Sequence, residues 1–208
     1  MRQHFGFLNW WPGDTKDEIF IGAILTQQTS WKNVERAISN LRSADSLSIK
    51  KISEMETSYL EGLIRPSGYY RQKAKRLSYI SKYVVQKYAS LNRMFKKNTM
   101  PLRGELLSLN GIGKETADSI ILYAAGKRVF VIDAYTKRIM SRVYAIKDDI
   151  EYDELQSMII SKIPPKIGLY KDFHAQFVEL GKNYCKAKPL CSKCPLKRYC
   201  LYNLQSSR

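Results

Sequence analysis

The stretch "SLNGIGKETADSI", residues 108–120, holds Gly111 and Gly113 between two segments with helical patterns. Glycine adopts backbone conformations that side chains forbid, and it leaves nothing projecting from a turn. A helix that begins near Lys114 would present its first backbone N–H groups and the positive end of its dipole beside this turn. Together with the charge of Lys114, these features predict a site for a phosphate group. An ordinary helix–helix turn that needs only one glycine is the alternative.

Most of the chain carries helical patterns. "DEIFIGAILTQQ" (17–28) reads as an apolar helix whose start Asp14 or Thr15 can cap. The only strand-like segment is "RVFVID" (128–133). Further helices are predicted within 31–42, 46–59, 61–64, 101–109, 114–125, 134–145, 152–162 and 168–182. Residues 65–77 read as a turn followed by a basic helix whose apolar face continues to Val84. We therefore expect an all-α protein with two lobes.

Basic residues strongly outnumber acidic ones. The 208 residues include 35 Lys and Arg against 19 Asp and Glu, which gives a formal net charge of +16. Such a surplus most often indicates a polyanionic partner, of which nucleic acid is the commonest. A basic surface kept for solubility and an anionic membrane surface are alternatives, which the spread of charge along the chain disfavours. No apolar run approaches the roughly 20 residues of a membrane span, and no signal-peptide core follows Met1, so we expect a cytoplasmic protein.

Several motifs together resemble one enzyme family. "LLSLNGIGKETADSIILYA" (106–124), followed by "VFVIDAYTKR" (129–138), resembles the helix-hairpin-helix DNA glycosylases of the endonuclease III superfamily. The resemblance extends to "ILTQQTSWKNV" (24–34), "SGYYRQKAKRL" (67–77) and the C-terminal cysteines, so it covers nearly the whole chain. It implies that the partner is double-stranded DNA with a damaged base. The lysine surplus and the lack of a transit signal suit a nucleoid-associated protein of a prokaryotic cytoplasm, and we expect a monomer because nothing in the sequence suggests an oligomer.

The resemblance also implies a domain organisation. A six-helix barrel lobe would span residues 17–127 and contain the helix-hairpin-helix at about 106–125. A second helical lobe would combine residues 1–16 with residues 128–208. This second lobe would end in a cysteine loop over residues 185–200.

Asp133 ends the apolar run "VFVI" and precedes a helical pattern, so taken alone it reads as a helix N-cap. The resemblance implies a second role, because Asp133 matches the catalytic aspartate of the family. The family hydrolyses the N-glycosidic bond of an extruded nucleotide through a transition state that resembles an oxocarbenium ion. An ionised carboxylate near the sugar stabilises that positive charge. The two roles are compatible, because a capping carboxylate is firmly held.

The residue after Lys114 separates two branches of the family. Bifunctional members have a lysine at the position of Glu115, and that lysine forms a Schiff base with the sugar and cuts the strand. A glutamate cannot do this, and neighbouring residues such as Lys114 point about 100° away around a helix. We therefore expect a monofunctional glycosylase that leaves an abasic site and has no AP-lyase activity.

Within the superfamily, "NWWPGD" (9–14) and "LTQQTSW" (25–31) resemble the 3-methyladenine glycosylases. Alkylated purines of this kind are cationic and leave easily, which suits an enzyme that has only a carboxylate and water. Electron-rich aromatic faces can recognise such a base by stacking. Of the tryptophans in these motifs, we expect Trp10 to lie outside the base pocket.

By this resemblance Trp11, Pro12 and Trp31 would line the base pocket, and Lys182 in "FVELGKNYC" would lie close to it. Gln27, near the end of its apolar helix, would fill the gap that the extruded base leaves. The alternatives are core positions for the tryptophans and ordinary surface positions for Gln27 and Lys182.

The four cysteines, Cys185, Cys191, Cys194 and Cys200, form the pattern C-x5-C-x2-C-x5-C. Thiols so clustered in an intracellular protein indicate zinc or an iron–sulfur cluster rather than disulfides. Zinc sites prefer two CxxC pairs, and the chain has one. The family carries a 4Fe–4S cluster on a similar loop, usually with one more residue in the first gap, and so implies that cofactor here. Lysines and an arginine within the loop would then face DNA phosphates.

Three other functions are open alternatives. The nearest is a related glycosylase for another base, such as mismatched thymine or uracil, an oxidised pyrimidine or mismatched adenine. A second is a DNA-damage-binding module without turnover, which would not need Asp133. A third is an iron–sulfur electron carrier, which would leave the glycine hairpin unexplained.

Overall fold

The computed structural model describes residues 1–8, 10 and 13–206. Within these ranges all regular secondary structure is helical, which confirms the predicted all-α fold. The strand-like segment 128–133 forms no strand, and backbone groups within it bond to side chains instead. Ile132 N donates to the Tyr152 hydroxyl at 3.2 Å, and Phe130 O accepts from Gln156 Nε2 at 2.5 Å. No described helix is long and apolar enough to cross a membrane.

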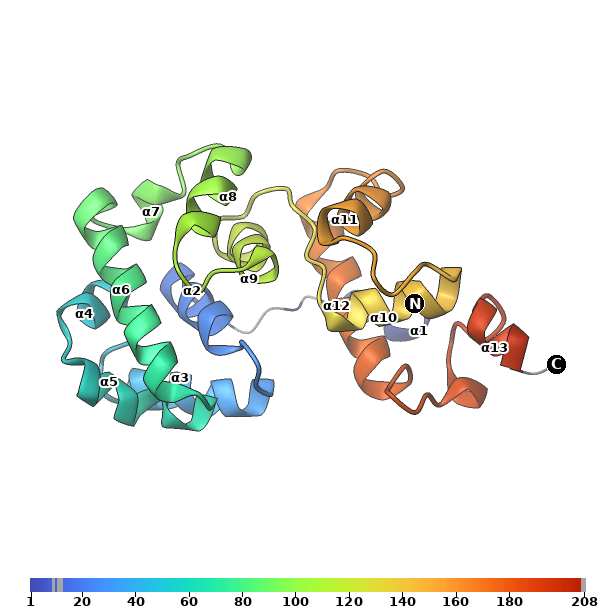
Figure 1. Ribbon diagram of the computed structural model, residues 1–208, viewed down its shortest axis with the longest axis horizontal. Helices are drawn as coiled ribbons and strands as arrows, with labels where there is room; N and C mark the ends of the chain where they lie inside the picture. Colours follow the sequence, from blue (N-terminus) through green and yellow to red (C-terminus); the bar gives the residue numbers. More distant parts are fainter. Residues whose placement is uncertain (9, 11–12, 207–208) are drawn as a thin grey trace. The chain divides into compact units, whose positions relative to one another are not determined.

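The chain folds as two compact units, whose helices are labelled in Figure 1. The terminal unit combines Met1–Trp10 with Arg128–Arg208, and the central unit comprises Trp11–Lys127. The division falls after Trp10, whereas the predicted lobes divide after residue 16. Residues 13–16 go with the central unit, because they lead into and cap its first helix.

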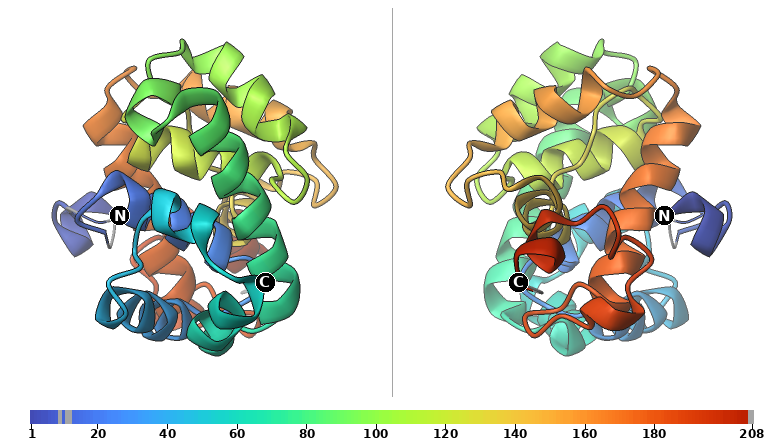
Figure 2. Two further views of the ribbon diagram at one scale, coloured as in Figure 1. Left: turned by 90° about the vertical axis from the view of Figure 1, so that its left-hand side faces the viewer. Right: turned by 90° about the vertical axis from the view of Figure 1, so that its right-hand side faces the viewer.

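The central unit is built around α6, on which α4 and α5 pack (Figure 2). Its core contains fully buried side chains of α2 and α6, among them Ile24, Leu77 and Ile80. The helices are α2 (Lys16–Leu25), α3 (Trp31–Ser43), α4 (Ile49–Glu54), α5 (Thr57–Ile64), η1 (Arg65–Ser67), α6 (Tyr70–Tyr88), α7 (Leu91–Met94), α8 (Thr99–Ser108), α9 (Lys114–Ser119) and the π-helical η2 (Ile120–Ala124).

Thr15 and Glu18 fix the start of α2. Of the two residues predicted as caps, Thr15 is the one that acts, since its Oγ1 accepts a hydrogen bond from Glu18 N at 3.1 Å. This bond satisfies a backbone donor that the first helical turn leaves open. The Glu18 carboxylate accepts a hydrogen bond from Asp14 N, just before the cap, at 3.2 Å and pairs with Arg42 Nη2 at 2.7 Å.

The end of α2 differs from the prediction. The helix stops at Leu25 and not at residue 28, so the segment that carries Gln27 and Gln28 is a turn. Gln28 has a φ of 54°, in the left-handed region that side chains seldom adopt. The carbonyl of Leu25 accepts a hydrogen bond at 2.8 Å from Lys73 Nζ on α6. That partner lies 48 residues away in the chain, and local periodicity does not reveal it.

A buried ion pair joins the two helices of the glycine hairpin. Arg103 on α8 donates from Nε to Asp118 Oδ1 at 2.7 Å and from Nη2 to Asp118 Oδ2 at 3.2 Å. Asp118, on α9, is fully buried. A two-pronged contact of this kind sets the angle between two groups as well as their distance. The pair therefore holds α8 and α9 in one orientation on either side of the turn.

A second polar cluster surrounds Glu105 on α8. Its carboxylate accepts hydrogen bonds from Tyr83 at 2.6 Å, from Tyr88 at 2.6 Å and from Lys97, and it pairs with Lys87 at 2.9 Å. Burial opposes ionisation of this carboxyl, but the hydrogen bonds outweigh it and lower the pKa of Glu105 from 4.5 to about 2. The cluster links α8 to the C-terminal end of α6.

Glu105→Gln is expected to remove a pH-dependent part of the stability. Because the folded-state pKa of about 2 lies below the ordinary 4.5, the contribution is complete above about pH 4.5 and disappears as the pH falls toward 2. At pH 7 the variant should lose on the order of 2 kcal/mol of unfolding free energy. Urea unfolding at a series of pH values measures this, with the exposed Glu54→Gln as control. A deficit that stayed constant down to pH 2 would contradict it.

The terminal unit is organised by α12, which binds the first residues of the chain. Asp172 Oδ1 accepts a hydrogen bond from Leu8 N at 2.7 Å, across 164 residues, and Gln176 Nε2 donates to Gly6 O at 2.7 Å. Both helix residues are buried. The elements are α1 (Arg2–Phe5), α10 (Ala134–Tyr144), α11 (Tyr152–Ile160), α12 (Ile167–Asn183), η3 (Cys191–Lys193) and α13 (Leu201–Ser206).

Candidate functional site

The glycine turn of the central unit needs its two glycines for different reasons. Gly111 has a φ of 90°, and a Cβ there would lie 2.0 Å from the side chain of Arg76. Gly113 has a φ of −89° that any residue can adopt, and a Cβ on it would meet nothing within 4 Å. Only Gly111 therefore has the special backbone conformation that both were predicted to need. Gly113 leaves open space at the start of α9, so a bulky partner can approach the backbone there.

Gln27 is held against this turn. Its Nε2 donates to Gly111 O at 2.8 Å and to Thr116 Oγ1 at 3.1 Å, while its Oε1 accepts from Arg76 Nη1 at 2.5 Å. The side chain predicted to fill a gap in DNA is thus engaged at both ends of its amide. The exposed side chain of this turn is that of Gln28.

Lys114 and Glu115 form the first turn of α9. Glu115 is exposed, and a carboxylate in the first turn is stabilised by the helix dipole. Lys114 is partly exposed. The Lys114 ammonium and the Glu115 carboxylate therefore belong to neighbouring residues at the start of α9.

Asp133, in the terminal unit, is the N-cap of α10. Its Oδ1 accepts hydrogen bonds from Thr136 N at 2.7 Å and from Thr136 Oγ1 at 2.8 Å. Its Oδ2 lies 3.5 Å from Nε2 of His174 on α12. Burial opposes ionisation of Asp133, but the contacts with His174 and Thr136 outweigh it and hold the pKa of this carboxyl below its usual value. The structure therefore provides a mostly buried carboxylate that is ionised at neutral pH.

Trp10 contacts both His174 and Lys182. The Lys182 ammonium lies 5.5 Å from the centre of the Trp10 ring, a cation–π contact, and the Trp10 and His174 rings are 6.1 Å apart. Lys182 also lies 3.7 Å from the carboxylate of Glu179. Within the terminal unit, these contacts run from Asp133 through His174 and Trp10 to Lys182.

Three further residues were predicted for the base pocket. Trp11 and Pro12 lie outside the described residues. Trp31 belongs to the central unit, at the start of α3, where its Nε1 donates to Glu35 Oε1 at 2.8 Å.

Sequence reasoning missed the partners of the predicted residues. His174 is one of only two histidines and stands inside an amphipathic helix, where an ordinary core position is the natural interpretation. The contact of Trp10 with Lys182 was not predicted either. Arg76 lies in a basic helix, and nothing local shows that it packs on Gly111. The one available signal was Thr136, three residues after an N-cap aspartate, where a capping partner is expected.

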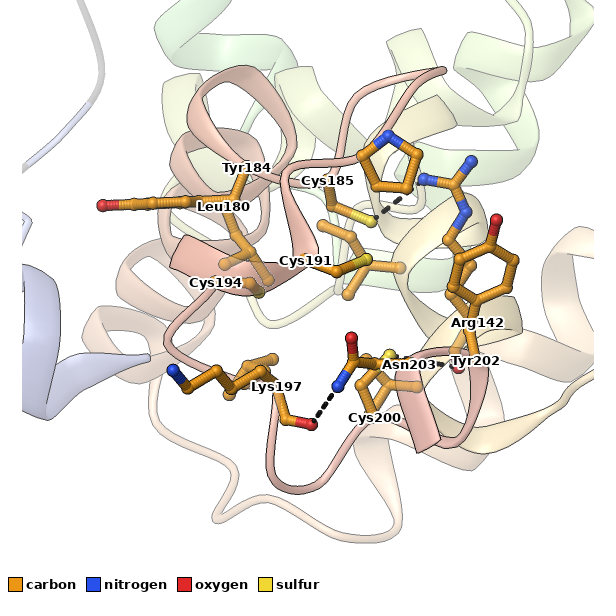
Figure 3. Close-up of a pocket in the computed structure, with 14 residues that line it drawn as sticks. Arg142, Leu180, Tyr184, Cys185, Cys191, Cys194, Lys197, Cys200, Tyr202 and Asn203 are labelled. Carbon is orange, nitrogen blue, oxygen red and sulfur yellow. Dashed lines mark hydrogen bonds between the residues drawn. The ribbon is translucent and has the colours of Figure 1, made fainter. Parts of the chain in front are cut away.

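The four cysteines line one pocket of the terminal unit, drawn in Figure 3. Cys185 follows α12, Cys191 begins η3, Cys194 follows η3, and Cys200 precedes α13. Among the described residues, no three His, Cys, Asp or Glu side chains converge closely enough to hold a single metal ion. The thiols of this pocket are spaced more widely than the ligands of a single metal ion. A cofactor that binds them all would therefore have to be larger than one ion.

Two arginines of α10 support the first part of the cysteine loop. Arg138 Nε donates to Cys185 O at 2.7 Å, and Arg142 Nη1 donates to Cys185 Sγ at 3.4 Å and to Lys186 O at 2.6 Å. Arg142 also bonds Ala187 O at 3.0 Å (Figure 3 shows its side chain beside Cys185). These bonds hold the backbone at the start of the loop and place a guanidinium beside the Cys185 sulfur.

Burial raises the pKa values of the Cys191 and Cys194 thiols above the usual value. Neighbouring cysteines raise the pKa of Cys191 further, because thiolates repel one another. Four thiolates in one small pocket therefore need a positive group among them. An iron–sulfur cluster supplies that charge and has the four-thiolate ligand set.

The sequence is similar to one known protein family and to a relative from an archaeon. A family model described as "HhH-GPD superfamily base excision DNA repair protein" matches residues 21–165. A protein of Methanocaldococcus jannaschii, provisionally named a DNA repair glycosylase, is 49% identical over 203 residues, which are 97% of this chain and 92% of that protein.

Two solved structures show the same fold. A 3-methyladenine DNA glycosylase of H. pylori, bound to 1,N6-ethenoadenine, is 35% identical with a TM-score of 0.72, over 83% of this chain and 87% of that one. A non-covalent complex of endonuclease III with DNA has a TM-score of 0.84 over 100% of this chain and 93% of that one. At 22% identity, this second match speaks for the fold alone.

Proposed function

The chain belongs to the HhH-GPD superfamily of base excision DNA repair proteins, and on this premise we propose that it is a monofunctional DNA glycosylase for alkylated purines. The observation that carries the proposal is the state of Asp133. Its carboxylate is mostly buried, is ionised at neutral pH, and has one oxygen held by Thr136. A fixed negative charge of this kind is what an oxocarbenium-like transition state requires.

In the proposed reaction the damaged nucleotide is first extruded from the duplex, which costs about a few kcal/mol. The N-glycosidic bond then breaks, and its electron pair leaves with the base. The Asp133 carboxylate stabilises the positive charge that develops on the sugar. Water adds to C1′ and loses a proton, which gives an abasic site. His174 keeps Oδ2 of Asp133 in place during this step, and Thr136 keeps Oδ1 in place.

We propose that the strand stays intact because Glu115 occupies the position of the strand-cleaving lysine. A carboxylate has no amine with which to form a Schiff base. Lys114 is adjacent but points in another direction around α9. Lys114 and the open backbone at Gly113 suit a phosphate contact instead.

An alkylated purine is the base we favour. The H. pylori relative, at 35% identity, is a 3-methyladenine glycosylase with a modified adenine bound. Trp11, Pro12, Trp31 and Lys182 are the residues proposed to contact the base. The contact of Lys182 with Trp10 supports a place for this lysine in the terminal unit near Asp133.

We also propose that the four cysteines hold a 4Fe–4S cluster. The support is the set of four thiols around one pocket and the family to which the chain belongs. When bound, the cluster would order the loop and direct its lysines toward DNA phosphates. Base hydrolysis transfers no electron, so the proposed reaction leaves the cluster unchanged.

Duplexes that each contain one damaged base test the proposed function. Incubation with a duplex that carries 3-methyladenine or 1,N6-ethenoadenine should give strand breaks only after alkali treatment, because alkali cleaves at abasic sites. Borohydride should trap no covalent complex. Breaks without alkali would contradict the monofunctional assignment. Breaks confined to duplexes with mismatched thymine, uracil or adenine, or with oxidised pyrimidines, would move the enzyme to another specificity. Binding of damaged DNA without release of any base would indicate a damage-binding module.

A further inference from the structure

One buried lysine joins two turns of the central unit. Lys73 on α6 donates from Nζ to Leu25 O at 2.8 Å and to Ser67 O at 2.6 Å, and the residue is only 2% exposed. Leu25 is the last residue of α2, and Ser67 is the last residue of η1. The ammonium group therefore binds the ends of two elements that are far apart in the chain.

Each of these ends leads into a turn with an exposed side chain on a left-handed backbone. Gln28 follows α2 with a φ of 54° and is exposed. Tyr69 follows η1 with a φ of 46° and is 65% exposed. Such conformations are strained in residues that carry a side chain, and they persist where the surroundings impose them. Lys73 binds one carbonyl at the base of each turn, namely Leu25 O for the first and Ser67 O for the second.

Arg76 holds the same region one helical turn further along α6. It donates to Gln27 Oε1 at 2.5 Å and packs on Gly111 of the glycine turn. Residues three apart share a helix face, so Lys73 and Arg76 act from the same side of α6. Thus one face of α6 holds the turn after α2, the turn after η1 and the glycine turn.

This arrangement is costly for Lys73. Burial and the nearby Arg76 charge lower the pKa of Lys73 to about 8. An apolar side chain at this position would leave the carbonyls of Leu25 and Ser67 without the ammonium group that binds them. What the lysine provides is a link between these two carbonyls at a defined spacing.

We propose that Lys73 is a positioning residue that sets the spacing of Gln28 and Tyr69, so that the two exposed side chains enter the DNA duplex as one unit and unstack it. This inference rests on the proposed function, because only an enzyme that extrudes a nucleotide needs such a unit. Lys73 itself contacts no DNA. It acts through Leu25 and Ser67, whose carbonyls it binds.

The test uses a duplex with a tetrahydrofuran abasic-site analogue and 2-aminopurine opposite it. Unstacking raises the fluorescence of 2-aminopurine, and no base needs to be released. Lys73→Met should reduce the protein-induced unstacking equilibrium about tenfold. Its affinity for undamaged duplex should stay within about twofold, since the buried Lys73 binds no phosphate. Lys82→Met is the matched control, because Lys82 is an exposed lysine on the same helix, and it should behave like wild type.

A double-mutant cycle separates positioning from general destabilisation. If Lys73 acts through the two turns, Lys73→Met should have little further effect in a Gln28→Ala, Tyr69→Ala background. Additive effects would overturn the proposal, as would unstacking by Lys73→Met at the wild-type level. If Lys73→Met does not fold, Lys73→Gln replaces it, because the shorter amide cannot reach both carbonyls. Because the probe contains no damaged base, failure of the excision assay would count against the proposed function and would not affect this result.

Discussion

Asp133→Asn is expected to lose base release by at least about 10²–10³-fold while its affinity for DNA is retained. The substitution removes the negative charge that would stabilise the sugar cation and changes little else. Asparagine is as good an N-cap as aspartate, so its Oδ1 can still accept from Thr136 and α10 should begin as before. Single-turnover excision on a 3-methyladenine duplex measures the rate, and binding to an abasic-site analogue measures the affinity.

Asp148→Asn provides the control for loss of one negative charge, because Asp148 is exposed in the same unit. It should excise at the wild-type rate. Thermal unfolding of Asp133→Asn should match that of wild type within a few degrees. If Asp133→Asn kept full activity, another group would have to supply the charge, and the central assignment of this site would be wrong.

The purified protein is expected to be brown and to contain about four iron atoms per chain. Cys194→Ser should lose the colour and most of the iron, because serine has the size of cysteine but is a poor ligand for this metal centre. The loop from Cys185 to Cys200 would then lose the charge that holds its thiolates together. We expect the melting temperature to fall by about 5 °C or more.

The same variant should bind DNA less tightly and with a weaker dependence on salt. For every phosphate that the disordered loop no longer neutralises, the slope of log affinity against log salt should become shallower by about 0.9. Lys193→Ala is the control, because it removes one loop charge and should keep the iron. Zinc in place of iron, or a colourless protein that binds DNA fully, would contradict the proposed cofactor.

Local patterns were sufficient for much of the fold. The apolar spacing predicted helices throughout, and Thr15, one of the two expected caps, does cap the start of α2. Asp133 follows an apolar run and caps the next helix, as expected from sequence. The cysteines are close together in the sequence, and they line one pocket.

What could not be predicted depends on distant residues. Gln27 reads as the last part of a helix, but its partners Gly111 and Arg76 lie 84 and 49 residues away. These contacts hold it in a turn. His174 lies on α12, far from Asp133 in the sequence, and no local periodicity predicts that the two side chains meet. The contact of Trp10 with Lys182 likewise depends on the docking of the N-terminal segment on α12.

Two separate constraints exclude a side chain at residue 111. Its φ of 90° excludes ordinary residues, and the side chain of Arg76 occupies the space where a Cβ would lie. Relief of either constraint alone would not admit a side chain. A side chain at residue 111 would have to displace the Arg76 side chain, which also binds Gln27, and adopt a strained backbone as well. A substitution of Gly111 would therefore disturb the turn that follows α2 together with the glycine turn itself.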